Sequence, residues 1–259
     1  MAFKNLSADD KQTVIQHFEE LRKSIIISVV AILVAALACF NYNEQLLGIV
    51  TLPLRSINQR LIVTGVTEAF FVKLQISILA GFVIAFPIVS WSIWRFIKPA
   101  LYPHERKYIY ILFPITLILF AAGVLFSYFG ILPLVLKFFV YIAGENLDTM
   151  FKVDQYVSFV MSFSIPFGLV FELPVITFFL TKIGVVKPEM LSKNRKYALL
   201  IIVVAAGALT PGPDPISQIM MAVPVYILYE VSIIVAKFAK PGRNNKKDDQ
   251  QGKSDDEVE

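Results

Sequence analysis

Residues 86–106 read FPIVSWSIWRFIKPALYPHER and pass from an apolar run into a compact charged turn. The last eight residues of this stretch are too polar to lie in lipid, where ionisable side chains are costly. They also contain too many prolines and aromatic residues for a simple spacer. The stretch therefore predicts the end of a membrane span followed by a structured loop, in which Glu105 is the residue of most interest.

The composition indicates a membrane protein. The 259 residues are 56% hydrophobic and only 17% charged, with a mean hydropathy of +0.67. Soluble domains contain about 25% charged residues. The apolar residues also form runs of about twenty, the length that a helix needs to cross the core of a bilayer. Lipid offers no hydrogen-bond partner for the backbone N–H and C=O groups, and a helix pairs these groups within itself. The sequence therefore predicts an all-α, polytopic integral membrane protein.

Six spans are predicted within a single domain of residues 1–236. Their approximate limits are 24–40, 69–94, 108–129, 156–181, 197–209 and 216–236. Residues 1–23 are predicted to form an amphipathic helix on the cytoplasmic surface, and residues 237–259 a disordered cytoplasmic tail. The fifth span extends only about 20 Å at helical rise, against a bilayer core of about 30 Å. The last two spans are therefore expected to form a short hairpin that needs bilayer thinning, tilt or a partner.

The distribution of Lys and Arg predicts the orientation. Nineteen of them lie before the first span, in the 95–107 and 182–196 loops, or in the tail, whereas the alternate loops contain four. Positively charged loops stay in the cytoplasm, so both termini are expected there. Glu105 and the N-terminal helix then share the cytoplasmic face, and the long loops 41–68 and 130–155 lie on the opposite face.

Signatures of catalysis are missing from the sequence, which contains no P-loop, H-E-x-x-H or G-x-S-x-G motif. The two histidines are interfacial and Cys39 is the single cysteine, so neither a metal site nor an intrachain disulfide is expected. The net charge of +4 comes from residues that follow the membrane segments and does not indicate nucleic-acid binding. We therefore expect neither an enzyme nor a cofactor.

Three carboxylates are candidates for function. Glu172 lies deep in the fourth span, where a charged carboxyl is costly and function is the default interpretation. It can instead be structural, either protonated or bonded to a carbonyl that Pro174 leaves free. Glu20 and Glu105 can be functional, or they can be ordinary surface ion-pair partners, which contribute about 1 kcal/mol or less.

Several short motifs occur in order between residues 14 and 236. They are His17-x-x-Glu20-Leu21-Arg22; Thr67-Glu68-Ala69-Phe70-Phe71 with Lys73; Phe86-Pro87 with Trp94-x-Phe96-x-x-Pro99-Ala100-Leu101-Tyr102-x-x-Glu105-Arg106; Tyr156-x-x-Phe159; Phe171-Glu172-x-Pro174; and Leu209-Thr210-Pro211 with Asp214 and Ser217-Gln218. No single motif is specific, but the ordered set resembles the TatC family, the multispanning subunit of the twin-arginine protein translocase. The sequence departs from the family at Ser92, where Gln is common, and at Gly212, an extra residue in the T-P-x-D turn.

The resemblance implies a receptor that binds the twin-arginine signal peptides of folded precursor proteins on the cytoplasmic face. It implies recruitment of TatA-type and possibly TatB-type single-span subunits, with export driven by the proton motive force. Signal-peptide binding is implied for His17, Glu20, Arg22, Phe96, Leu101, Glu105 and Arg106. An intramembrane polar site for partner subunits is implied for Glu172, Asp214 and Gln218, and structural roles are implied for Pro53, Pro87, Pro99 and Pro174.

The resemblance also implies a concave bundle with an extracytoplasmic cap, assembly with further copies in the complex, and contact with lipid in the cell membrane of a prokaryote. Arginine suits such a receptor because its planar guanidinium group can donate two parallel hydrogen bonds to one carboxylate. Three other interpretations remain. A secondary transporter or channel for a small solute predicts inverted repeats, which the two halves do not show. An intramembrane enzyme lacks a nucleophile or acid pair, and a structural scaffold is the weakest alternative.

Overall fold

The computed structural model describes residues 8–55, 57, 59, 61–103, 105–144, 150–210 and 214–239, with side chains from His17 onward. The elements in chain order are α1 (Ala8–Phe40), α2 (Asn43–Val50), α3 (Leu52–Arg55), β1 (Leu61–Ile62), α4 (Glu68–Ile97), the 3-10 turn η1 (Lys98–Ala100), α5 (Arg106–Phe126), the π turn η2 (Ser127–Ile131), α6 (Leu132–Ala143), β2 (Phe151–Lys152), α7 (Val153–Val170), α8 (Leu173–Lys182), α9 (Pro188–Lys193), α10 (Arg195–Leu209) and α11 (Pro215–Phe238). Gly212 and residues 240–259, which include most of the predicted tail, lie outside the described residues.

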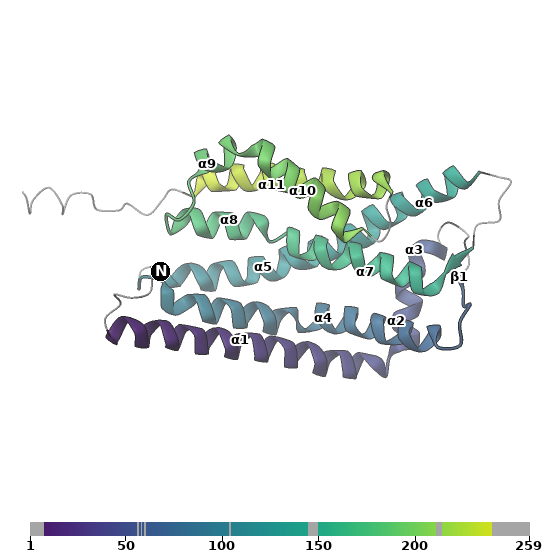
Figure 1. Cartoon of the computed structure of the whole chain (residues 1–259), viewed down its shortest axis with the longest axis horizontal. Helices are drawn as coiled ribbons and strands as arrows, with labels where there is room; N and C mark the ends of the chain where they lie inside the picture. The colour runs from purple at the N-terminus through teal and green to yellow at the C-terminus, as the bar shows by residue number, and fades with distance from the viewer. Residues whose placement is uncertain are drawn as a thin grey trace, which may run out of the picture.

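The predicted all-α, multispan fold is confirmed. Among the described residues, five helical segments are long and apolar enough to cross a membrane, and the long helices lie roughly side by side in Figure 1. The segments are His17–Phe40, Glu68–Ile97, Arg106–Ile142, Val153–Lys182 and Pro215–Phe238. The predicted fifth span corresponds to α10, whose 15 residues extend about 22 Å and fall short of a bilayer core of about 30 Å. A sixth crossing through α10 stays a prediction.

The structure differs from the predicted boundaries in three places. The predicted surface helix and first span form one continuous helix, α1. The third span does not stop near residue 129, because η2 and α6 continue the helix and bury Leu132, Val135 and Leu136 in the core. The expectation that both final spans are short is wrong for the second of them. Helix α11 has 24 residues, about 36 Å, because its helical hydrogen bonding continues past Pro224 to Phe238.

The fourth span is broken in the middle, shortly before Pro174, whereas Pro166 lies within the continuous α7. Helix α7 ends at Val170, two turn residues follow, and α8 begins at Leu173 with Pro174 in its first turn. Proline is tolerated at the start of a helix, where its missing N–H would have no partner. The break places Glu172 directly before the first turn of α8. By contrast, Pro87 lies within the continuous α4.

Two clusters of buried side chains hold the helices together. The larger cluster joins α4, α6, α7 and α11, and Phe163 and Phe167 of α7 are completely buried in it. The smaller cluster lies near η1, where Trp94 packs edge-on against Phe179 with 5.1 Å between ring centroids. Leu101, from the loop after η1, is part of this second cluster. We call this side of the bundle the η1 end.

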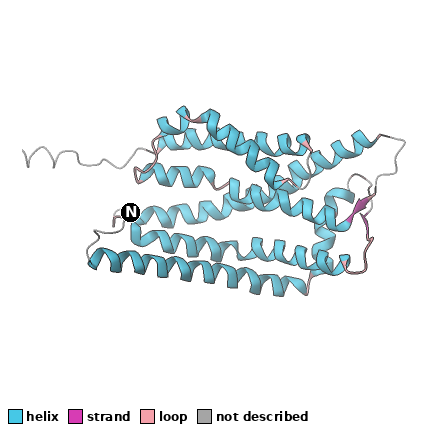
Figure 2. Ribbon diagram, viewed as in Figure 1, coloured by secondary structure: helices cyan, strands magenta, loops and turns pink. Residues whose placement is uncertain are grey.

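The opposite side of the bundle is closed by a small cap made of α2, α3, β1 and β2 (Figure 2). The two strands pair in parallel, with Leu61 opposite Phe151. The hydroxyl of Tyr156 donates to the carbonyl of Val50 at 2.7 Å, and the hydroxyl of Tyr128 donates to the carbonyl of Ile49 at 2.5 Å. These bonds tie α2 to the ends of the long helices.

Candidate functional site

Helices α1 and α4 approach each other closely along their length. Gly81 faces Ala36 so tightly that an added Cβ would lie 2.6 Å from the Ala36 nitrogen. Nearer the η1 end, the Ser24 hydroxyl donates to the Ser92 carbonyl at 3.3 Å, and the Ser92 hydroxyl donates to the Ser24 carbonyl at 3.2 Å. Ser92 therefore makes a polar contact between α1 and α4. The two reciprocal bonds fix the relative positions of α1 and α4 beside a cavity.

This cavity, the η1 cavity, has a volume of about 500 Å³ and lies between α1, the end of α4, η1 and the start of α5. Its walls contain Glu20, Lys23, Ser24, Ile26, Ile27, Arg95, Phe96, Lys98, Pro99 and Arg106. The structure thus brings together four of the residues predicted from the sequence: Glu20, Phe96, Pro99 and Arg106. They come from segments about eighty residues apart in the chain.

His17 and Glu20 share one face of α1, as the i, i+3 spacing requires. The His17 ring stacks on Phe96 with 4.4 Å between ring centroids, which anchors this part of α1 to the end of α4. His17 Nδ1 lies 3.8 Å from Glu20 Oε2, and about half of each side chain is exposed. The carboxylate of Glu20 can therefore accept hydrogen bonds from an incoming cation.

Glu105 and Leu101 do not line the η1 cavity. Glu105 is only 8% exposed, and its Oε2 accepts a hydrogen bond from the Tyr102 backbone N–H at 3.2 Å. Leu101 is part of the core cluster beneath the loop. The predicted residue Arg22 is exposed on α1 and also lies outside the cavity walls. The two predicted carboxylates are therefore in different environments, one open and one enclosed by its own loop.

The cationic character of this cavity was not predicted from the sequence. Lys23, Arg95 and Lys98 line it together with Arg106, against the single carboxylate of Glu20. Lys98 donates to the Tyr110 hydroxyl at 3.0 Å. These cations were counted only as signals of orientation. Their convergence could not be foreseen, because they come from α1, α4, η1 and α5.

Glu172 is 7% exposed at the break between α7 and α8, beside Thr116 of α5. Within the described part of the chain, neither Glu172 Oε1 nor Thr116 Oγ1 has a hydrogen-bond partner. Close packing surrounds this break. A Cβ at Gly123 of α5 would lie 2.6 Å from the Phe167 carbonyl oxygen. The polar groups nearest to this buried carboxyl are the Thr116 hydroxyl and the backbone of Phe120.

Asp214 and Gln218, which were predicted to belong to the same polar site as Glu172, make local structural bonds. Asp214 caps α11 by accepting from the Ser217 N–H at 2.7 Å. The Gln218 amide donates to the Val203 carbonyl of α10 at 2.8 Å. A further link that was not predicted joins Arg195 to Glu230 through two bonds of 2.8 and 2.9 Å. The bonds of Gln218 and Arg195 connect α10 to α11, whereas the Asp214 bond lies within the start of α11.

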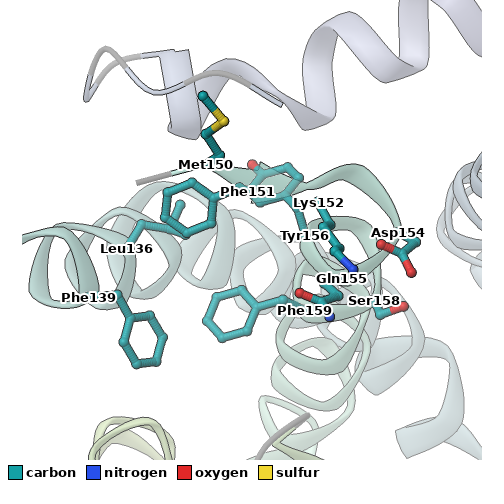
Figure 3. A pocket seen from close by; sticks show the side chains of 10 residues that line it. All are labelled: Leu136, Phe139, Met150, Phe151, Lys152, Asp154, Gln155, Tyr156, Ser158 and Phe159. Carbon is teal, nitrogen blue, oxygen red and sulfur yellow. The ribbon is translucent and has the colours of Figure 1, made fainter. Parts of the chain in front are cut away.

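Pro53, predicted to hold the cap, is buried in α3. Next to the cap is a second cavity of about 420 Å³, whose lining comes from α6, β2 and the start of α7 (Figure 3). Its residues are Leu136, Phe139, Met150, Phe151, Lys152, Asp154, Gln155, Tyr156, Ser158 and Phe159. Most of its wall is aromatic or aliphatic, with the polar side chains on one side. Among the described residues, no three His, Cys, Asp or Glu side chains are grouped as a metal site would require.

The long apolar helices, the broken fourth segment and the charged cavity at one end define an all-α, multispan membrane protein. Residues 16–224 match the family model described as Sec-independent protein translocase protein (TatC). The chain therefore belongs to the TatC family. As a component of this translocase it is a transport protein and not an enzyme.

Individual relatives align with most of this chain and with nearly all of their own length. The chain is 46% identical to the Sec-independent protein translocase protein TatC of Carboxydothermus hydrogenoformans over 233 residues, which is 90% of this chain and 96% of the relative. It is 38% identical to the TatC protein of Aquifex aeolicus over 86% of this chain and 94% of that protein. A crystal structure described as the twin arginine translocase receptor TatC superposes with a TM-score of 0.80, at 38% identity, and covers 86% of this chain and 99% of its own.

Proposed function

We propose that this chain is the receptor subunit that binds twin-arginine signal peptides of folded precursors at the cytoplasmic face of a prokaryotic cell membrane. The observation that supports this most directly is the η1 cavity, where half-exposed Glu20 lies beside the stacked rings of His17 and Phe96. A guanidinium group can bind a carboxylate bidentately and lie flat on an aromatic ring. The edge of the cavity offers both groups, the carboxylate of Glu20 and the aromatic rings of His17 and Phe96.

The position of the cations restricts how the peptide binds. Lys23, Arg95 and Arg106 line the same cavity and repel an arginine that enters deeply. In the proposal, the first arginine of the peptide therefore binds at the exposed edge of Glu20, next to His17. This geometry also disfavours lysine, which has no planar fork to lie on the rings.

Glu105 is the second carboxylate of the proposal. Its Oε2 already accepts from the Tyr102 N–H, so binding of the second arginine requires the loop to share or exchange that bond. Replacement by Ala removes both the charge and the loop contact. Glu105→Gln keeps an acceptor for Tyr102 and removes only the charge. The two variants therefore separate a binding role of Glu105 from a role in shaping the loop.

We propose six crossings with both termini cytoplasmic, with α10 as the short fifth crossing in thinned or sheltered lipid. Exposed apolar side chains of α10 then face TatA-type or TatB-type single-span subunits, and buried Glu172 takes a polar group of such a partner. Export uses the proton motive force, and several copies of the chain assemble in one complex.

The test is site-specific crosslinking of a twin-arginine signal peptide to the full chain in membranes. Glu20→Ala is expected to weaken binding about tenfold, in line with the loss of one charge-assisted hydrogen-bonded contact. Glu19→Ala, on the neighbouring exposed position of α1, is the matched control and should bind as the wild type does. Unchanged crosslinking in both Glu20→Ala and Glu105→Gln would contradict the receptor proposal, provided that the proteins are inserted and equally abundant.

A further inference from the structure

The four cations of the η1 cavity lack sufficient negative charge within the protein. Of the described residues that line the cavity, Glu20 alone is acidic. Lys98 is bonded to Tyr110, whereas the side chains of Lys23, Arg95 and Arg106 make no hydrogen bond or ion pair within the described part of the chain. The cavity therefore presents a net positive charge to whatever fills it.

The positive-inside rule explains why cations lie on this face, but it does not require them to converge. Here four cationic side chains from α1, α4, η1 and α5 surround one volume of about 500 Å³. Like charges at such separations repel each other unless an anion lies between them. Convergence of this kind is what a phosphate-bearing ligand needs.

An apolar surface of α1 continues from one wall of the cavity. Ile26 and Ile27 form part of its wall and are about half exposed. The exposed surface of α1 continues from them through Val30, Leu33 and Val34. Only 6% of the apolar stretch of α1 is buried inside the protein, so this helix presents an open aliphatic surface beside the cationic cavity. A ligand that fits both parts has an anionic head and a long hydrocarbon chain.

Aromatic side chains place the cavity at the depth of lipid headgroups. Trp91, Trp94 and Tyr110 line a smaller neighbouring cavity that shares Arg95 and Lys98 with the η1 cavity. Trp91 and Tyr110 are also exposed. Tryptophan and tyrosine gather at the membrane–water interface, and basic pockets between helices on the cytoplasmic side bind anionic headgroups.

We propose that the η1 cavity binds the phosphate headgroup of an anionic phospholipid, with an acyl chain lying along α1 from Ile26 and Ile27. The headgroup phosphate accepts hydrogen bonds from Lys23, Arg95 and Arg106 and offsets part of their positive charge. This site does not depend on signal-peptide binding, although it lies beside the proposed peptide site. A free phosphate ion shares the headgroup chemistry but does not use the aliphatic surface of α1.

The chain offers a direct probe, because its two tryptophans, Trp91 and Trp94, both lie next to the cavity. The full chain in mild non-ionic detergent is titrated with phosphatidylglycerol brominated on its acyl chains, and tryptophan quenching is measured. Brominated phosphatidylcholine is the neutral lipid, and glycerol phosphate is the soluble competitor. The wild type is expected to prefer phosphatidylglycerol, and glycerol phosphate should not displace it.

The double variant Lys23→Gln/Arg95→Gln is expected to lose affinity for phosphatidylglycerol by about fivefold for each cation removed. The variant Lys187→Gln/Lys193→Gln removes two exposed cations outside the cavity and should behave as the wild type does. Arg95→Lys keeps the charge and should retain binding, which controls for misfolding of the double variant.

Three results would overturn the proposal: equal quenching by the two lipids, equal losses in the cavity and control variants, or displacement by glycerol phosphate, which would indicate a free-phosphate site. The outcome is also separable from the receptor proposal. Glu20→Ala removes negative charge from the cavity and should raise the preference for phosphatidylglycerol while it lowers peptide crosslinking. Each proposal can therefore fail while the other holds.

Discussion

Replacement of Gly81 by Ala tests how closely α1 and α4 must pack. The new Cβ would lie 2.6 Å from the nitrogen and 2.7 Å from the Cα of Ala36, whereas carbon atoms normally pack about 3.5–4.0 Å apart. Helix α1 must therefore move away by about 1 Å. Overpacking of this kind costs about 1–3 kcal/mol, which exceeds the gain of about 0.5–1 kcal/mol from replacing glycine inside a helix.

We therefore expect Gly81→Ala to lower the unfolding midpoint in detergent and to lengthen the bonds between Ser24 and Ser92. Gly48→Ala in α2 is the matched control, because nothing lies within 4 Å of its added Cβ, and it should be neutral or stabilising. The obstacle is the backbone of Ala36, so adding Ala36→Gly should restore little stability. A wild-type midpoint for Gly81→Ala, or complete rescue by Ala36→Gly, would refute the reasoning.

Two further substitutions test the cap and the start of α11. Tyr156→Phe leaves the buried carbonyl of Val50 without its donor and should cost about 1–3 kcal/mol of stability. Tyr128→Phe removes the same kind of bond at a less buried position and should cost less. Limited proteolysis of the cap measures both effects, and equal effects would contradict the burial argument. Asp214→Ala removes the acceptor of the Ser217 N–H and should cost about 1 kcal/mol of stability, measured by chemical denaturation. Asp214→Asn keeps an acceptor and should retain most of that stability. An equal loss with Asn and with Ala would show that the charge matters more than the acceptor.

The arrangement of the membrane segments was largely predictable from the sequence, because the length and apolarity of a span follow directly from the bilayer. Helix limits were less predictable. The extension through α6 depends on the burial of Leu132 and Val135 against other helices, whereas Gly130 and Pro133 in the sequence favour a break at this point. The continuity of α1 across the predicted boundary at residue 24 was missed because polar residues can continue a helix beyond the membrane.

The candidate site was predictable only in part. His17, Glu20 and Phe96 were grouped through the family resemblance, and the structure places Phe96 against the His17 ring at the edge of the η1 cavity. By contrast, Glu105 and Arg106 are adjacent in the sequence, yet Arg106 lines the cavity and Glu105 turns back toward Tyr102. That difference depends on the path of the loop after η1, which the sequence pattern does not specify.

The parallel pairing of β1 with β2 has a consequence for how the protein is made. Leu61 meets Phe151, about ninety residues later, and both α4 and α5 lie between them. Bringing the ends of such a long segment together costs about 4 kcal/mol in chain entropy when nothing else constrains it. As the ribosome delivers the chain from its N-terminus, the cap cannot close until residue 152 has emerged. Helices α1 and α4 can therefore pack together before the cap closes, whereas the cap must wait for the start of α7.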